Sequence, residues 1–118
     1  MPQSALSQII LYVEDMAKAV WFYHEVLGFP VRYPSETSDF SSEMWVELDA
    51  GGCTLALHGG AQHPPDQQHA LVFKVDDLEA ARAELLRNGI EVGEIHLLED
   101  GLPVAKGIDP AGHHFSIR

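Results

Sequence analysis

The sequence predicts an α+β protein: two βαβββ units forming a cupped mixed sheet, with helices on its outer face. In residues 8–31 a strand-like segment, a helix closed by glycine and the start of another strand follow one another. A looser copy of this pattern occupies residues 69–92, and alternating segments follow each copy. A chain built from two such copies has a seam, and small molecules often bind at seams.

The 118 residues are expected to form a single domain, because this length can bury a core without disulfides. The first unit is expected at about residues 6–58 and the second at about 69–118. Between them, residues 59–68 have no hydrophobic periodicity and contain two adjacent prolines. This stretch is predicted to be a linker between the units.

The elements of the first unit follow from alternation and from turn residues. Residues 7–13 alternate as a strand, Asp15 is a suitable N-cap, and Gly28 suits the left-handed end of a helix. Within this helix, Trp21 is expected in the core together with the inward stripe of Met16, Val20, Tyr23 and Leu27. Further strands are predicted at 31–34, at 44–48 with Met44, Val46 and Leu48 on one face, and at 53–58 after a turn at 50–52.

The second unit repeats this order with weaker strands. A strand through Leu71 and Phe73 precedes a helix that Asp77 caps and Asn88-Gly89 closes. Three more strands are predicted at 90–95, 104–108 and 114–117, with a tight turn at 109–112.

Composition narrows the class of partner. The formal net charge is −11, from 18 acidic and 7 basic residues, which disfavours nucleic acid and anionic membrane surfaces. No apolar stretch approaches the ~20 residues of a membrane span, and no secretory signal is recognisable. The single cysteine, Cys53, permits no intrachain disulfide, so a cytoplasmic location is expected. Cys53 itself is interpreted as a packing residue.

One face of each predicted sheet is purely apolar and suits the helix, whereas the other face is mixed. Such a mixed face suits a ligand cavity, although a solvated sheet surface explains it about equally well. Tyr12 and Trp45 could form an aromatic wall for a planar or cationic ligand, or could simply fill the cup. The candidate ligand-binding residues are Gln8, Tyr12, Trp45, Glu47, His58, His114 and Ser116.

The segments Y-V-E-D-M and F-Y-H-E-V-L-G-F, the internal duplication and D-P-A-G-H before the last strand carry a family resemblance. In these features the chain resembles the vicinal oxygen chelate superfamily, which includes glyoxalases, extradiol dioxygenases, fosfomycin-resistance thiol transferases and bleomycin-resistance proteins. The resemblance covers nearly the whole chain and implies a cup made by two units, in a homodimer. It specifies a fold rather than a function, because the fold hosts many chemistries.

The resemblance also implies four metal-ligand positions. They fall on Gln8, Ala56, Ala70 and Ser116 in this chain. Alanine offers no donor atom and neutral serine binds divalent ions poorly, so no metal cofactor is expected. The alternative is a displaced zinc or nickel site built from His58, His114 and His69.

The favoured hypothesis is therefore a metal-free protein of the bleomycin-resistance type that binds a small cationic or aromatic molecule. The first rival is an enzyme, a glyoxalase-like lyase or isomerase or a dioxygenase-type enzyme. It would use either the displaced metal or a metal-free acid/base pair such as Glu47 and His58. The second rival is a dimeric interaction module whose cavity is closed by side chains.

Overall fold

The computed structural model describes residues 8–60, 71–98 and 101–118. The predicted α+β class is confirmed, with one mixed sheet of four strands and another of five, accompanied by helices. The chain divides into two compact units, residues 1–64 and 65–118, and each contains its own sheet and helix. His69 and Ala70 lie outside the described residues. No helix in the described part of the chain is long and apolar enough to cross a bilayer.

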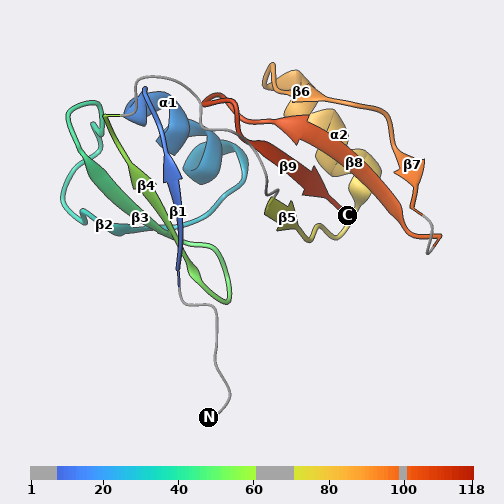
Figure 1. The fold of residues 1–118 in the computed structure, drawn as a ribbon, viewed down its shortest axis with the longest axis horizontal. Coiled ribbons are helices and arrows are strands. Elements are labelled where there is room, and N and C mark those ends of the chain that lie inside the picture. Colours follow the sequence, from blue (N-terminus) through green and yellow to red (C-terminus); the bar gives the residue numbers. More distant parts are fainter. Residues whose placement is uncertain (1–7, 61–70, 99–100) are drawn as a thin grey trace, which may run out of the picture. The chain divides into compact units, whose positions relative to one another are not determined.

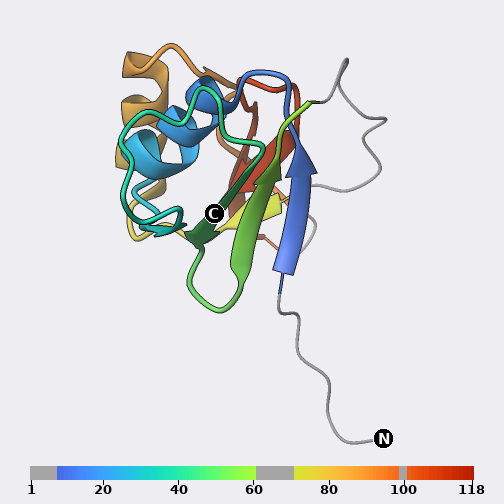
Figure 2. The same cartoon turned by 90° about the vertical axis from the view of Figure 1, so that its left-hand side faces the viewer.

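Unit 1 is a βαβββ unit (Figure 1). Its strands run in the order β1-β4-β3-β2, with β1 parallel to β4 and the other neighbours antiparallel; Figure 2 shows β1, β4 and β3 side by side. The elements are β1 (Gln8–Tyr12), α1 (Met16–Val20), the π-helix η1 (Trp21–Val26), β2 (Val31–Tyr33), β3 (Trp45–Asp49) and β4 (Thr54–His58).

The helix of unit 1 begins and ends where the sequence predicts. The Lys18 backbone N–H donates to the Asp15 carboxylate at 3.0 Å, and Gly28 has φ +85°. Its second half is a π-helix, in which the Leu27 N–H donates to the Phe22 carbonyl at 2.9 Å. The sequence did not predict this wider turn, which accompanies the burial of two consecutive rings, Phe22 and Tyr23.

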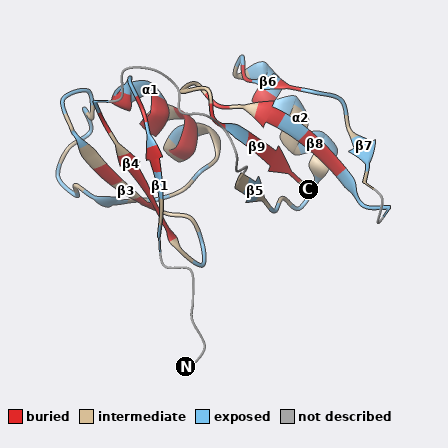
Figure 3. Cartoon of the chain, in the orientation of Figure 1, coloured by how far each residue is buried: buried red, intermediate tan, exposed pale blue. Residues whose placement is uncertain are grey.

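The core of unit 1 lies between this helix and one face of the sheet (Figure 3). Three predictions about it are wrong. Trp21 and Leu27 are half-buried rather than in the core, since Phe22 and Tyr23 fill the inner face of the π-helix. Met44 is exposed because β3 begins only at Trp45. The buried strand residues on this face are Leu11, Val46, Leu48, Leu55 and Leu57.

Unit 2 repeats the topology of unit 1. Its strands run β5-β9-β8-β6, with β5 parallel to β9, and the sequence did not predict β7, which pairs with β8. The expected strand at 90–95 ends at Val92, because pairing to β8 stops near Gly93. The elements are β5 (Leu71–Phe73), α2 (Leu78–Arg87), β6 (Glu91–Val92), β7 (His96–Leu97), β8 (Pro103–Ile108) and β9 (His114–Ile117).

Local capping explains the ends of these elements too. The Ala80 N–H donates to the Asp77 carboxylate at 3.1 Å, as the sequence predicts. In the turn before β9, the buried carboxylate of Asp109 accepts from the N–H groups of Ala111 (2.9 Å) and His113 (2.8 Å). These two hydrogen bonds fix the conformation of the turn that leads into β9.

Candidate functional site

Strand register arranges the mixed face of unit 1 into three rows. Each row takes one residue from β1, one from β4 and one from β3, because these strands are neighbours with aligned Cα partners. The three rows are Tyr12–His58–Trp45, Ile10–Ala56–Glu47 and Gln8–Thr54–Asp49. Five of the residues selected from sequence, Gln8, Tyr12, Trp45, Glu47 and His58, therefore lie on one sheet face.

The first row is aromatic. The ring centroids of Tyr12 and His58 are 5.2 Å apart, and those of His58 and Trp45 are 5.9 Å apart with the planes at 86°. These are ordinary separations for interacting rings. Tyr12 remains 50% exposed, so this row presents ring surface at the face of the sheet.

The imidazole of His58 has one defined partner. Its Nδ1 lies 2.8 Å from the carbonyl oxygen of Gly59. A carbonyl can only accept, so Nδ1 carries the proton and donates. In the neutral ring Nε2 is then a hydrogen-bond acceptor.

Glu47 is held by its neighbour on the same strand. The indole Nε1 of Trp45 donates to Oε2 of Glu47 at 2.8 Å, and both residues are half-buried. The second carboxylate oxygen, Oε1, can accept a further hydrogen bond. Glu47 and His58 thus each bind a different group, and the hypothetical acid/base pair is not joined by a direct bond.

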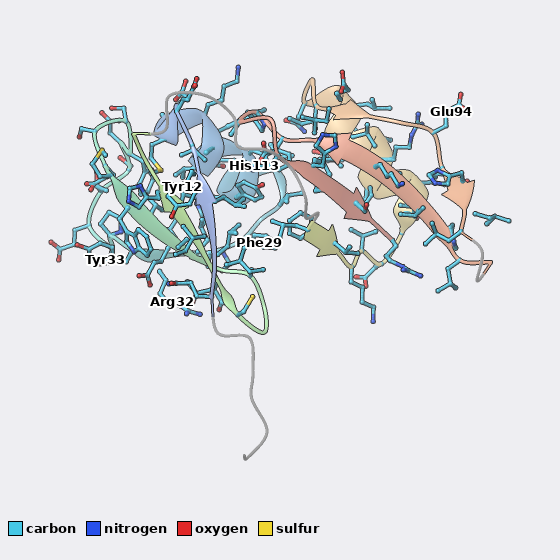
Figure 4. The ribbon with its side chains drawn as sticks, viewed as in Figure 1. Tyr12, Phe29, Arg32, Tyr33, Glu94 and His113 are labelled. Atoms are coloured by element: carbon cyan, nitrogen blue, oxygen red, sulfur yellow. The ribbon has the colours of Figure 1, made fainter. Side chains whose placement is uncertain are left out.

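Two further residues of this face, Arg32 and Tyr33, were not predicted. Val31 pairs with Leu48 and Tyr33 with Glu47, so β2 carries one extra residue at a bulge. The Arg32 guanidinium donates to Oγ1 of Thr54 at 2.6 Å and lies 3.4 Å from the Asp49 carboxylate. Figure 4 shows Arg32 toward the end of the sheet opposite Tyr12. Simple alternation gives no signal for such a bulge, because it depends on the partner strand.

The two remaining candidates, His114 and Ser116, lie on β9 of unit 2. Ser116 is buried between Val72 and Lys106 in the register, and exposed His114 pairs with Ile108. Because the two sheets share one topology, Ser116 corresponds to Ala56 of unit 1.

The implied metal positions offer a poor donor set. Ala56 is fully buried with only a methyl side chain, and Ser116 offers one hydroxyl. Gln8 is exposed on β1, and Ala70 lies outside the described residues. Across the described residues, no group of three or more His, Cys, Asp or Glu side chains could hold a metal ion. The residues at these positions do not fit the ion that the resemblance implies.

The fold and the sequence define the class of protein. The sequence of residues 5–116 matches the family model of the Glyoxalase/Bleomycin resistance protein/Dioxygenase superfamily, and the chain belongs to this superfamily. A comparison with curated proteins gave no match.

Several solved structures are similar to this chain over nearly its full length. SMU.1112c is 26% identical with a TM-score of 0.78, and the alignment covers 97% of each chain. TnmS3, an antibiotic binding protein from Streptomyces sp. CB03234, is 23% identical with a TM-score of 0.78 over 100% of this chain and 97% of its own. A lactoylglutathione lyase from Agrobacterium tumefaciens is 22% identical with a TM-score of 0.75 over 99% and 94%. A binding protein and an enzyme thus share this fold, which by itself does not assign a function.

Proposed function

We propose that this chain is a metal-free binding protein that holds a small aromatic or cationic molecule on the mixed face of unit 1. The observation that carries the proposal is the row of Tyr12, His58 and Trp45, whose neighbouring centroids are 5.2 and 5.9 Å apart. Rings at the surface of a sheet can pack against a planar guest, and tyrosine and tryptophan faces attract cations.

The position of Glu47 supports a cationic ligand rather than a neutral one. Its carboxylate is fixed by the indole of Trp45, which leaves Oε1 to attract a cationic group beside the same rings. The net charge of −11 adds a general attraction for cations.

The donor set supports binding without a metal. Ala56 and Ser116 stand at two of the four positions where the family resemblance implies ligands. A tight site needs three or more nitrogen or carboxylate donors that converge, and these two residues supply none.

A second candidate function is catalysis, as a glyoxalase-like lyase or isomerase or a dioxygenase-type enzyme. The observation that favours it is the hydrogen bond from His58 to Gly59, because it leaves Nε2 as a base. In a metal-free reaction His58 would take a proton from a substrate held by the ring row. The displaced-metal form would instead recruit His58, His114 and His69.

Elemental analysis of protein purified without a histidine tag separates these functions. We expect well under one transition-metal ion per chain; a stoichiometric ion would contradict the metal-free proposal. Loss of such an ion in His58→Ala or His114→Ala would locate the displaced site.

Thermal shift and calorimetry test the ligand class. We expect benzyltrimethylammonium or phenol to raise the melting temperature, whereas cyclohexanol, which has no aromatic ring, should not. The rise should disappear in Trp45→Ala and persist in Leu86→Ala, which shortens an exposed side chain on α2. If no aromatic compound binds, the interaction-module hypothesis is favoured instead.

We also propose a homodimer in the cytoplasm. The family resemblance supports the dimer, and the single cysteine supports a reducing compartment. Sedimentation velocity of the purified protein tests the oligomeric state.

A further inference from the structure

We propose that unit 1 has a second binding site, for a small primary ammonium compound, on the helix side of its sheet. The site is a hollow of about 240 Å³ between the helix and the segment that connects β2 to β3. Figure 2 shows this segment running alongside α1 and η1. Tyr12 and Trp45 lie on the other face of the sheet, so the proposal does not depend on the aromatic row.

The π-helix turns Trp21 toward the hollow. Phe22 and Tyr23 are fully buried and fill the inner face of η1, so the residues on either side of this pair lie farther out. Trp21 is accordingly half-buried, and it lines the hollow together with Glu25, four residues further along. π-Helical turns often occur at functional sites. Here the wider turn places an aromatic ring and a carboxylate in one hollow.

Asp39 and Phe40 line the hollow from the opposite side. Oδ1 of Asp39 accepts from the Ser41 hydroxyl at 2.7 Å and from the Ser41 N–H at 3.0 Å, which leaves Oδ2 to accept a further hydrogen bond. These two bonds hold the pKa of Asp39 below its usual value of 3.8, so the carboxylate is charged at neutral pH. The half-buried ring of Phe40 adds a second aromatic surface.

His24 supplies a third hydrogen-bond acceptor to the lining. Its Nδ1 lies 2.7 Å from the carbonyl oxygen of Phe29, so Nδ1 carries the proton and donates. In the neutral ring Nε2 is then an acceptor, and it lies 3.9 Å from Oε1 of Glu25. A cation that bears several N–H groups can donate to both of these acceptors at once.

These features select the ligand by charge, by hydrogen bonding and by size. Two carboxylates line the hollow, and no lysine or arginine of the described residues does. Aromatic faces attract cations, and a primary ammonium can donate to the acceptors of Glu25, Asp39 and His24. An organic cation fits better than a metal ion, because the described part of the chain has no group of three or more metal-binding side chains. The volume is just below the range of about 300–1,000 Å³ for drug-sized ligands, so the ligand is small.

Tryptophan fluorescence in the Trp45→Phe variant tests the site, because Trp21 is then the single indole of the chain. The probe is n-butylammonium. Butyltrimethylammonium keeps the chain and the charge but has no N–H group, and n-butanol keeps the chain without the charge. We expect n-butylammonium to change the emission of Trp21 and to bind about tenfold more tightly than either control compound.

Neutral variants locate the charge that holds the ammonium. Asp39→Asn keeps an oxygen to accept from Ser41 but loses the charge, and it should weaken n-butylammonium binding about tenfold. Glu36→Gln is the matched control, because Glu36 is exposed in the same loop but does not line the hollow; it should change binding less than about twofold. Glu47→Gln should leave the response of Trp21 unchanged, which separates this site from the one proposed on the sheet.

Three results would overturn the proposal. In the first, n-butylammonium leaves the emission of Trp21 unchanged. In the second, n-butanol or butyltrimethylammonium binds as tightly as n-butylammonium. In the third, Glu36→Gln weakens binding as much as Asp39→Asn does, which would mean a general attraction to the net charge of −11 rather than a defined site.

Discussion

The indole Nε1 of Trp45 donates a hydrogen bond of 2.8 Å to Oε2 of Glu47, two residues along the same strand. Residues i and i+2 of a strand share a face, so the bond lies flat on the sheet. It fixes the indole edge-on to the imidazole of His58, at a centroid distance of 5.9 Å. One interaction therefore sets both the aromatic surface and the position of the nearest carboxylate.

Tryptophan fluorescence should report ligand binding on this face. The chain has two tryptophans, Trp21 on η1 and Trp45 on β3. In Trp21→Phe the remaining indole lies in the proposed site, so benzyltrimethylammonium should change its emission. In Trp45→Phe the change should disappear. An equal change in both variants would contradict the placement of the ligand.

Gly107→Ala should destabilise unit 2 by about 2 kcal/mol or more, through overpacking. A Cβ on Gly107 would lie 2.7 Å from Phe115 Cζ and 2.8 Å from the Glu91 carbonyl oxygen. Gly93→Ala is the matched control, because its nearest neighbour would be the Lys106 carbonyl at 3.7 Å. Urea unfolding should show the larger loss of stability for Gly107→Ala, and equal losses would contradict the close packing around Gly107.

Asp109→Ala should lower the free energy of unfolding by about 2 kcal/mol, because two backbone N–H groups lose their acceptor at a site where Asp109 is only 4% exposed. Asp109→Asn keeps one acceptor oxygen and should cost less. Chemical denaturation of both variants measures the difference. If the two variants lose the same stability, the charge of the carboxylate rather than its acceptor oxygen is the main contribution.

Glu84 should titrate below the usual value of 4.5 for a glutamate. The hydrogen bond from Arg87 is the main cause of the lowered pKa, and the Arg87 charge adds to it. A carboxyl whose pKa is lower in the folded state stabilises the protein at neutral pH, and this contribution is lost as the pH falls through the folded-state pKa. In Arg87→Gln, NMR titration should show the pKa of Glu84 rising toward 4.5 while that of Asp39, held low by its hydrogen bonds with Ser41, stays unchanged.

Parts of the site could be predicted because they follow from alternation within one strand. Tyr12 and Gln8 share a face of β1, as do Trp45 and Glu47 of β3, and these pairs needed no knowledge of the partner strands. The bulge that adds Arg32 and Tyr33 to the face is different, because it exists only in the pairing of β2 with β3. For the same reason, the hydrogen bond between Arg32 and Thr54 could not be foreseen.

The sequence by itself determined what depends on neighbours a few residues apart: the helix caps at Asp15 and Asp77, the glycine at position 28, and the repeated order of strands and helix. The residue types at the implied metal positions also determine which donor atoms are available to a metal ion, independently of the fold. The tertiary structure alone decided which side chains meet across strands, such as Tyr12 with His58 and Trp45 with His58. The physical reason is that caps and alternation come from local backbone geometry, whereas register is set by pairing between segments distant in the chain.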